Sequence, residues 1–452
     1  MSNRRRKRNG SSLVTVLLLL LIVLSAAALV LHFNDPGDPQ LKLPTETPTE
    51  ATQPTEEVTE PPTTEPTEPP VTLVATAEIS ATGDMLMHLP CINAAKTGSS
   101  YDFTPFFTYL QSYIQNADYA VANLETTLAG TAYKYSGYPA FNCPDDIVTS
   151  VQQVGFDMLL TANNHCYDTR TTGFHRTLEV IKEAGLDSLG TVDSVEDAQY
   201  LVKDINGIRI GMVCYTYEDN ADPEVMAPNG ITMSNADEVL INTFCNNDLE
   251  TFYTRIEGQI DEMKEAGAEA IVLYIHWGVE YQLKENSTQN TIAQKMCDLG
   301  VDVIVGGHPH VVQPMELLTS TEDESHKTLC IYSVGNALSN QRLGLISAIK
   351  TAHTEDGIVF NFAFSKYSDG TVRVEAADVL PTWVYKSSSG SKDAYQVYPL
   401  DDQVEDWKAQ FDMSSSVEKE ARASYDRTMK IVGSGLADIQ DYLNTLPPIA
   451  EN

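Results

Sequence analysis

The chain has 452 residues, of which 42% are hydrophobic, so it can build one large globular domain or two smaller ones. The formal net charge is −34, and five of the basic residues lie together at positions 4–8, which leaves the remainder still more acidic. A body this acidic argues against nucleic acid as a partner and against docking on anionic lipid, because both need clustered cations.

The N-terminal segment has the pattern of a membrane anchor. A basic tip over 1–12 precedes an apolar run over 13–31 that is broken only by Thr15 and Ser25. At about 1.5 Å per residue, a helix of this length nearly spans a hydrocarbon core of about 30 Å. The basic tip places the N-terminus in the cytoplasm and the remainder outside it. We therefore predict a single-pass signal-anchor over 13–32 in the cell membrane, with the main domain extracytoplasmic. The alternative is a signal peptide cleaved near the small residues at 25–28, which also places the body outside the cytoplasm.

Residues 33–71 form a segment rich in proline, threonine and glutamate. It contains almost nothing to bury, so we predict a disordered linker. Proline and mutual repulsion of the glutamates keep such a chain extended, which suits a spacer that holds a domain away from a membrane.

From residue 72 the chain alternates short apolar runs with helix-forming segments, which is typical of an α/β domain. Several predicted helices end at a glycine just before the next strand, and glycine stops helices because it readily adopts the left-handed conformation. Strands are predicted over 77–81, 119–123, 158–161, 208–215, 270–275, 301–305, 329–334 and 358–364. Helices are predicted over 103–115, 145–153, 172–184, 249–266 and 291–299. We therefore predict one α/β domain over 72–400 with at least one substantial sheet.

The C-terminal segment over 401–452 differs from the body. It is charged and helix-prone, especially over 417–444, and contains few residues with catalytic or ligand chemistry. We predict a helical extension that is either packed on the domain or partly disordered.

The seven cysteines do not form a recognisable site or disulfide framework. No two have CxxC spacing, which argues against a zinc ribbon or a thioredoxin motif. Their number is odd, so at least one lacks a partner within the chain. The favoured interpretation is that these thiols are buried as small hydrophobic side chains.

Metal-competent residues follow five of the predicted strands. In open α/β sheets, ligands gather beyond the carboxyl ends of the strands. Five of the nine histidines fall at such ends, and neither chance nor core packing would gather them there. The residues at these ends are Asp84 and His88, then Glu125, then Asn164, His165 and Asp168, then His276, and finally His308 and His310.

This mixture of imidazole nitrogens and oxygen ligands suits a pair of divalent metals. Two metals about 3.5–4 Å apart can hold both the attacking and the leaving oxygen of a phosphoryl transfer. Gly306 and Gly307 allow a tight turn at the last strand end, and Pro309 stiffens it. We predict divalent metal ions as the cofactors, two in number, with Mn, Fe, Zn and Mg all open as their identity.

Six stretches in chain order carry a family resemblance: TGD at 82–84, ANLE at 122–125, ANNH at 162–165 with Asp168, HWGVEY at 276–281, GGHPH at 306–310 and YSVGN at 332–336. Over 76–341 the chain resembles the bacterial capsule synthesis protein CapA family, also described as poly-γ-glutamate biosynthesis proteins. That family is similar to the calcineurin-like metallophosphoesterases. The resemblance implies a metallophosphoesterase-like α/β sandwich, with two sheets flanked by helices and the metal site at one edge.

The resemblance also implies roles for individual residues. Asp84 and His310 correspond to ligands of a first metal, and Glu125 falls where those enzymes have a bridging carboxylate. Asn164, His276 and His308 correspond to ligands of a second metal. His165 corresponds to the residue that protonates a leaving group or steadies the transition state, and Asp168 is expected to orient the His165 loop.

Two positions depart from the phosphoesterase pattern. Leu86 stands where those enzymes have a histidine two residues after the aspartate, and His88 is the candidate substitute ligand. Glu125 replaces the usual bridging aspartate. Both departures concern the ligands expected around the first metal.

Three further residues are weaker candidates for substrate contact: Glu280, Tyr281 and Asn336. Glu280 has the alternatives of a partner of His276 or a solvated loop residue. Asn336 either shapes the site or caps a turn.

Three functions remain open from the sequence. The first is a metal-dependent hydrolase or transferase of the cell envelope that acts on a phosphoester or on an anionic polymer. The second is a non-catalytic assembly or export factor that binds an anionic polymer such as poly-γ-glutamate through its metals. The third is a chain whose metal site has become structural. In the first two, the expected partners are the substrate or polymer, the membrane through the N-terminal helix, and a membrane-bound polymer synthesis machinery.

Overall fold

The computed structural model describes residues 71–218, 225–389 and 392–447. The predicted basic tip (1–12), the anchor (13–32) and the linker up to residue 70 lie outside the described residues. Among the helices that are described, none is both long and apolar enough to cross a membrane.

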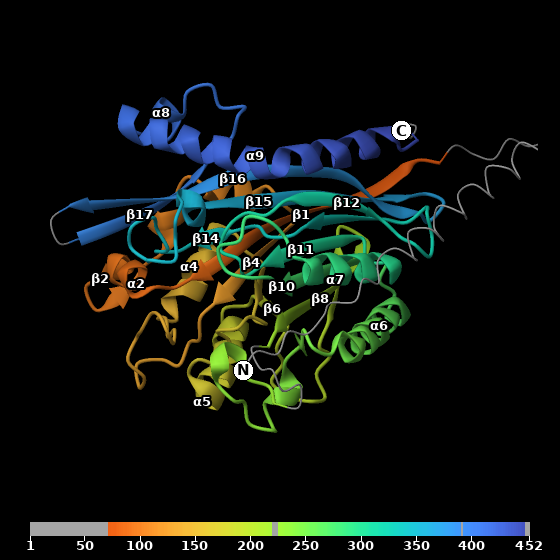
Figure 1. The fold of residues 1–452 in the computed structure, drawn as a ribbon, viewed down its shortest axis with the longest axis horizontal. Helices are drawn as coiled ribbons and strands as arrows, with labels where there is room; N and C mark the ends of the chain where they lie inside the picture. The colour runs from red at the N-terminus through yellow and green to blue at the C-terminus, as the bar shows by residue number, and fades with distance from the viewer. Residues whose placement is uncertain (1–70, 219–224, 390–391, 448–452) are drawn as a thin grey trace, which may run out of the picture. The chain divides into compact units, whose positions relative to one another are not determined.

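Two β-sheets form the centre of the domain (Figure 1). The first has eight strands. Strand β1 pairs in parallel with the strands on one side of it and antiparallel with the strand on its other side. Its order is β17 (Lys392–Pro399), β16 (Val372–Ser389), β15 (Asp356–Tyr367), β1 (Leu73–Leu86), β4 (Tyr119–Glu125), β5 (Met158–Leu160) and β6 (Asp187–Leu189), with β14 (Asn336–Leu338) paired to β1. The second has seven strands, in the order β12 (Met315–Thr319), β13 (Lys327–Ile331), β11 (Val303–Gly307), β10 (Ala270–His276), β8 (Ile208–Tyr217) and β7 (Leu201–Ile205), with β9 (Thr243–Phe244) paired to β8.

Alternate side chains of the two sheets meet in a common core. Ile79 and Val121 of the first sheet belong to the same buried cluster as Met212 and Val272 of the second. The opposite faces are covered by helices, as the apolar strands require. The first sheet is covered by α2 (Leu89–Ala95), η1 (Thr104–Phe107), α3 (Gln111–Gln115) and α4 (Asp146–Val154), and the second by α6 (Leu249–Glu265) and α7 (Ser287–Asp298). The predicted mixed α/β fold, with two sheets flanked by helices, is confirmed.

The remaining short elements lie in the connections. Helix α5 (Arg170–Glu183) joins β5 to β6. Its Phe174 belongs to the core between the two sheets, and its Ile181 belongs to the core between the first sheet and its covering helices. The other pieces are β2 (Lys96–Thr97), β3 (Ser100–Tyr101), η2 (Pro228–Gly230), η3 (Glu238–Leu240), η4 (Ala352–Glu355) and α8 (Trp407–Gln410). All seven cysteines are buried, as predicted.

Several boundaries differ from the prediction for physical reasons. The helix expected over 103–115 is divided into η1 and α3, which are separated by a turn at residues 108–110. Strands β7, β12, β16 and β17 were not predicted. They lie at or near sheet edges, and their alternation of polar and apolar residues gives no continuous apolar run. Pro381 also lies inside β16, where proline normally argues against a strand.

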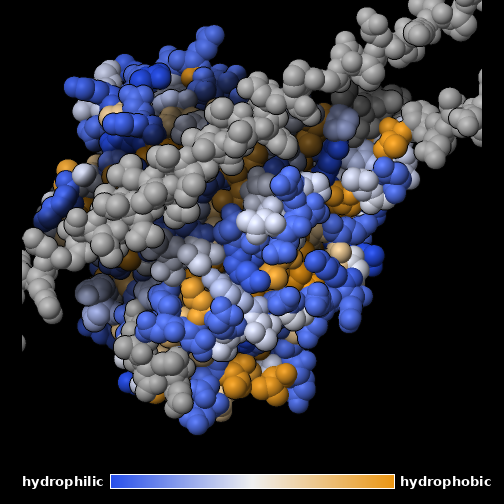
Figure 2. All heavy atoms as spheres, turned by 45° about the vertical axis from the view of Figure 1, so that its right-hand side comes forward, coloured by the Kyte–Doolittle hydropathy of each residue, from blue (hydrophilic) through white to orange (hydrophobic). Residues whose placement is uncertain are grey.

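The surface is dominated by polar side chains. Figure 2 shows a largely hydrophilic face, on which hydrophobic residues occur in small groups. This agrees with the acidic composition of the chain.

The C-terminal helix α9 (Ser415–Thr445) joins the two sheets at one side of the domain. It lies across β16 of the first sheet and packs against β12 of the second (Figure 1). Val432, Leu436 and Ile439 belong to the core between the sheets. Gly435 permits this close approach, because a Cβ atom there would lie 2.0 Å from the Met315 carbonyl oxygen.

An ion pair fixes α9 to β15. Arg427 donates from Nε and Nη2 to the Asp356 carboxylate at 2.8 and 2.6 Å, and Ser424 Oγ donates to the same group at 2.5 Å. Asp356 is 1% exposed, so its charge depends on these donors. Burial raises the pKa of Asp356, although Arg427 and Ser424 oppose that rise.

We predict that Arg427→Ala lowers the free energy of unfolding by about 3–5 kcal/mol, because it leaves a buried carboxylate without its cation. Urea denaturation measures the change. Lys430→Ala removes an exposed cation from the same helix and should have little effect. The Asp356→Asn substitution in the Arg427→Ala background should recover part of the loss. A loss below 1 kcal/mol in Arg427→Ala would contradict the role of this pair.

Candidate metal centre

The carboxyl ends of β1, β4, β10 and β11 converge at one edge of the sandwich, where close backbone contacts require glycine. A Cβ atom on Gly83 would lie 1.8 Å from the Gly335 carbonyl oxygen, and one on Gly306 would lie 2.1 Å from the Tyr332 carbonyl oxygen. The Asp84 amide donates to the Gly335 oxygen at 3.0 Å. These contacts bring the residues that follow the strands into one small volume.

Two groups of buried ligand atoms meet at Glu125. Glu125, His276 and His308 form one group, and Asp84, Glu125 and His310 form the other. His310 Nδ1 lies 3.0 Å from Asp84 Oδ2, while Glu125 Oε1 lies 3.5 Å from His276 Nε2 and 3.7 Å from His310 Nε2. The carboxylate of Glu125 is therefore shared by both groups.

Asn164 belongs to the side of the site that contains His276. Its Oδ1 lies 3.0 Å from His276 Nε2, and His276 Nε2 lies 3.2 Å from His308 Nδ1. The structure thus brings together the predicted ligands Asp84, Glu125, Asn164, His276, His308 and His310.

Asn123 and Asn163, which were not proposed as site residues, form a chain of hydrogen bonds that ends on the ligand Asp84. Asn163 Nδ2 donates to Asn123 Oδ1 and to the Leu124 carbonyl oxygen, both at 3.0 Å. Asn123 Nδ2 then donates to Asp84 Oδ1 at 2.8 Å. The available signal was their place in the sequence, because Asn163 directly precedes the candidate ligand Asn164 and Asn123 lies two residues before Glu125.

The charges of the site are strongly coupled. Burial would raise the pKa of Asp84, but hydrogen bonding and charge from His310, with His276 and Asn123, lower it. Burial lowers the pKa of His310, yet Glu125, Asp84 and Glu280 outweigh it and raise that pKa to about 9. Burial and the neighbouring histidines hold the pKa of His308 well below its usual value, so its ring is neutral and offers a lone pair.

Two observations show that the residues fit a bound metal. Glu125 Oε1 and His310 Nε2 are buried and have no hydrogen-bond partner among the described residues. A buried polar atom in that state is costly unless a ligand satisfies it. In addition, His308 and His310 adopt positive φ angles of 93° and 56°, which are strained for residues other than glycine.

His165 and Asp168 form a hydrogen-bonded pair next to the ligand groups. His165 Nδ1 lies 2.8 Å from Asp168 Oδ2, and the Phe141 amide donates to the same oxygen at 2.6 Å. A carboxylate only accepts, so His165 Nδ1 carries the hydrogen and Nε2 remains for another group. Burial lowers the pKa of His165, but Asp168 and Glu125 outweigh it and the net pKa is raised.

His88 lies outside both ligand groups. Its Nδ1 contacts the Leu86 carbonyl oxygen at 3.1 Å, and its ring packs edge-on against Phe141 at 5.3 Å between centroids. Burial is the main cause of its lowered pKa of about 4. Among the described residues, no contact places His88 in the role of the histidine that phosphoesterases have at the position of Leu86.

The three weaker candidates occupy different positions. Glu280 is 43% exposed at its side chain, with Oε1 3.9 Å from His310 Nε2. Tyr281 has a φ of 65°, and its ring is tilted by 37° to that of His310, with the two centroids 6.4 Å apart. Asn336 is fully buried, and its amide donates to the carbonyl oxygens of His310 and Thr354. Asn336 thus braces the His310 loop from inside the fold.

Tyr217 is a neighbour of the centre that the sequence did not single out. Its ring lies 4.6 Å from that of His308 and is stacked with that of His276 at 6.5 Å, measured between centroids. It ends β8, the strand next to β10, so its place at a strand end was the available signal.

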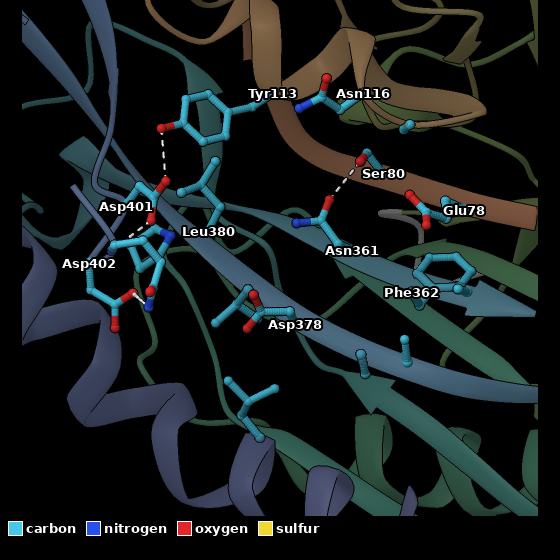
Figure 3. Close-up of a pocket in the computed structure, with 18 of the residues that line it drawn as sticks. Glu78, Ser80, Tyr113, Asn116, Asn361, Phe362, Asp378, Leu380, Asp401 and Asp402 are labelled. Atoms are coloured by element: carbon cyan, nitrogen blue, oxygen red, sulfur yellow. Dashed lines mark hydrogen bonds between the residues drawn. The ribbon is translucent and has the colours of Figure 1, made fainter. Parts of the chain in front are cut away.

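A cavity that is lined by carboxylates lies away from this centre. It has a volume of about 710 Å³ and opens on the face of β1, β15 and β16 between α3 and α9 (Figure 3). Its lining contains the carboxylates of Glu78, Asp378, Asp401 and Asp402 but no histidine, cysteine or basic residue. It therefore lacks the ligand set that the strand ends provide.

Residues 78–341, more than half of the chain, match the family described as "Bacterial capsule synthesis protein PGA_cap". The chain belongs to this family. All the ligand residues of the centre lie inside the matched range, so the family assignment and the geometry concern the same part of the fold.

The chain is also similar to two Bacillus proteins named CapA. The chain is 27% identical over 242 residues to "Capsule biosynthesis protein CapA" of Bacillus anthracis, a match that covers 52% of this chain and 54% of that protein. It is 27% identical over 321 residues to "PGA biosynthesis protein CapA" of Bacillus subtilis (strain 168), covering 69% of this chain and 76% of that protein. The match thus spans about half the length of the first relative and three quarters of the second.

Among solved structures, NAD nucleotidase (NadN) of Haemophilus influenzae has a similar chain. The TM-score is 0.40 at 12% sequence identity, and the match covers 82% of this chain and 68% of that one. A similarity of this size does not extend to residue roles.

We predict that Asn163→Asp lowers the free energy of unfolding by about 3 kcal/mol or more, because it replaces Nδ2, which donates both hydrogen bonds, by one oxygen that faces two buried acceptors. Urea denaturation measures it. Asn290→Asp, at an exposed position of α7, is the matched control and should change stability by less than about 0.5 kcal/mol. Equal stability of Asn163→Asp and the wild-type chain would rule out the bracing role.

Proposed function

We propose that this PGA_cap protein binds two divalent metal ions at the strand ends and uses them in a hydrolytic or transfer reaction of the cell envelope. The observation that carries the proposal is the sharing of the buried Glu125 carboxylate by two histidine-containing ligand groups. A shared carboxylate between two such groups suits a bridged pair of metals.

The ligand groups divide between two positions. Asp84, His310 and Glu125 would hold one ion, and His276, His308, Asn164 and Glu125 the other. The imidazole nitrogens favour Zn, Mn or Fe over Mg, which prefers oxygen ligands. Ions bound there would supply Lewis-acid stabilisation of negative charge on a phosphoryl or carbonyl oxygen and would make water nucleophilic at neutral pH.

His165 is the group of this chain that would exchange a proton with the substrate. Its Nδ1–H is held by Asp168, which fixes the ring orientation and leaves Nε2 for the reacting group. This arrangement suits protonation of a leaving oxygen.

The substrate class that we propose is a phosphoester or an anionic polymer such as poly-γ-glutamate. The names of the two relatives, which refer to capsule and PGA biosynthesis, support this class. The net charge of −34 repels a polyanion, so contact would depend on the positive charge of the metals. The apolar run over 13–31 supports a place in the cell membrane with the domain outside, beside a membrane-bound polymer synthesis machinery.

A second candidate function is assembly or export of the polymer without catalysis. The relatives are named for biosynthesis and not for a hydrolytic reaction, which favours this candidate. The metals would then bind carboxylates of the polymer without bond cleavage. The two functions share the ligand groups and differ in turnover.

We predict two metal ions per chain after loading with Mn²⁺ or Zn²⁺, measured by elemental analysis of the purified protein. Glu125→Ala removes the shared ligand and should reduce the content to less than one, whereas His308→Ala should leave about one. His353→Ala, which removes a histidine bonded to Thr351 outside the ligand groups, should retain two. Two metals in Glu125→Ala, or none in the wild-type protein, would contradict the proposal.

We predict Mn²⁺-dependent turnover of a generic phosphodiester or of poly-γ-glutamate, with kcat lowered about 100-fold in His165→Ala at unchanged metal content. Initial rates and elemental analysis on the same preparations measure both quantities, again with His353→Ala as control. Full metal occupancy without turnover on either substrate would favour the export function. Wild-type rates in His165→Ala would exclude His165 as the proton donor.

A further inference from the structure

Asn229 connects three segments that surround His165. It belongs to η2, in the segment over 225–242 that follows β8, and its backbone is left-handed with φ 50° and ψ 33°. Its Nδ2 donates to Asp168 Oδ1 at 2.8 Å and to the Pro139 carbonyl oxygen at 2.9 Å. A side-chain amide has two N–H donors, so these two bonds use both of them.

These bonds complete the surroundings of the Asp168 carboxylate. Oδ1 accepts from Asn229, while Oδ2 accepts from the Phe141 amide and from His165 Nδ1. The Asp168 side chain is 0% exposed. Each oxygen accepts from a donor and solvent does not reach the side chain, so the carboxylate is fully hydrogen-bonded in one orientation. That orientation determines which His165 nitrogen carries the hydrogen.

Asn229 does not replace Asp168 as the partner of His165. Its Nδ2 also lies 3.3 Å from His165 Nδ1, but both atoms are donors once Asp168 has accepted the His165 hydrogen. The amide therefore acts on the ring through the carboxylate.

A second group of hydrogen bonds holds the segment over 225–242, which contains Asn229. Asp237, 2% exposed, accepts from Tyr167 Oη at 2.6 Å and from Thr171 Oγ1 at 2.5 Å. Tyr167 and Thr171 lie on either side of Asp168 in the chain. The segment over 225–242 therefore binds both the Asp168 carboxylate, through Asn229, and the turn that contains Asp168, through Asp237. These two attachments fix the position of Asn229 relative to that turn.

We propose that Asn229 is a positioning residue, which fixes the Asp168 carboxylate and through it the orientation and tautomer of His165. Its kinetic consequence rests on the proposed function, whereas its effect on the His165 hydrogen bond does not. Without Asn229, Asp168 Oδ1 has no partner in a buried site, and the carboxylate turns to share its remaining donors. A displaced carboxylate then holds the ring less firmly.

The left-handed backbone provides a clean substitution. Glycine adopts this conformation without strain, so Asn229→Gly removes the amide and leaves the backbone in place. Asn206→Gly is the matched control, since Asn206 has φ 53° in the turn between β7 and β8 and its amide binds the Thr76 carbonyl oxygen instead. Asn229→Ser, whose side chain is too short to reach Asp168, keeps the test available if the glycine variant is not recovered folded.

Two readouts test the proposal on the full chain. The first is the Nδ1–H proton resonance of His165, observed by NMR with labelled histidine and assigned by its loss in His165→Gln. We expect a downfield resonance in the wild-type protein and in Asn206→Gly, and an upfield shift or exchange broadening in Asn229→Gly. The second is kinetic: we expect kcat to fall about 10-fold in Asn229→Gly with KM unchanged.

The outcomes separate this proposal from the proposed function. An unchanged His165 resonance in Asn229→Gly would overturn the positioning role, whatever the activity. A shifted resonance with unchanged kcat in an active enzyme would overturn its relevance to the reaction. If the wild-type protein has no turnover, the proposed function fails, and a shifted resonance still establishes that Asn229 positions the pair.

Discussion

The arrangement of the centre depends on the buried carboxylate of Glu125. An ionised carboxylate in a protein interior needs compensating positive charge and hydrogen-bond donors. Glu125 is fully buried, and its Oε1 has no hydrogen-bond partner among the described residues, although imidazole nitrogens surround it at 3.5–3.7 Å. Metal ions on both sides of this group would satisfy the oxygen and the surrounding nitrogens together.

The rest of the fold brings the strand ends that carry the ligands together around Glu125. The two sheets meet through one hydrophobic core, so that β1 and β4 of one sheet and β10 and β11 of the other present their carboxyl ends to the same space. Glycines at 83 and 306 permit the backbone approach, and the Asn123–Asn163 pair orients the ligands from below. Helix α9 fixes the two sheets to each other at one side, through Arg427 and the apolar residues that it adds to the core.

Much of the site could be predicted because its signal is local. Each ligand directly follows an apolar run, and parallel strands place such residues at one edge, so Asp84, Glu125, His276, His308 and His310 could be grouped from the sequence. Asn229 could not be found in this way. It lies in a connection without periodicity, 61 residues from Asp168, and only the folded chain brings them together. The edge strand β17 and its neighbour β16 were also missed, because their sequences mix polar and apolar residues and offer no continuous apolar run.

Anomalous diffraction from crystals of the protein loaded with Mn²⁺ or Zn²⁺ tests directly whether two metal ions share Glu125. We expect two strong anomalous peaks about 3.5–4 Å apart, one on each side of the Glu125 carboxylate. One peak lies beside Asp84 and His310, and the other beside His276 and His308. A fully loaded crystal without a peak within bonding distance of Glu125 would contradict this sharing of Glu125.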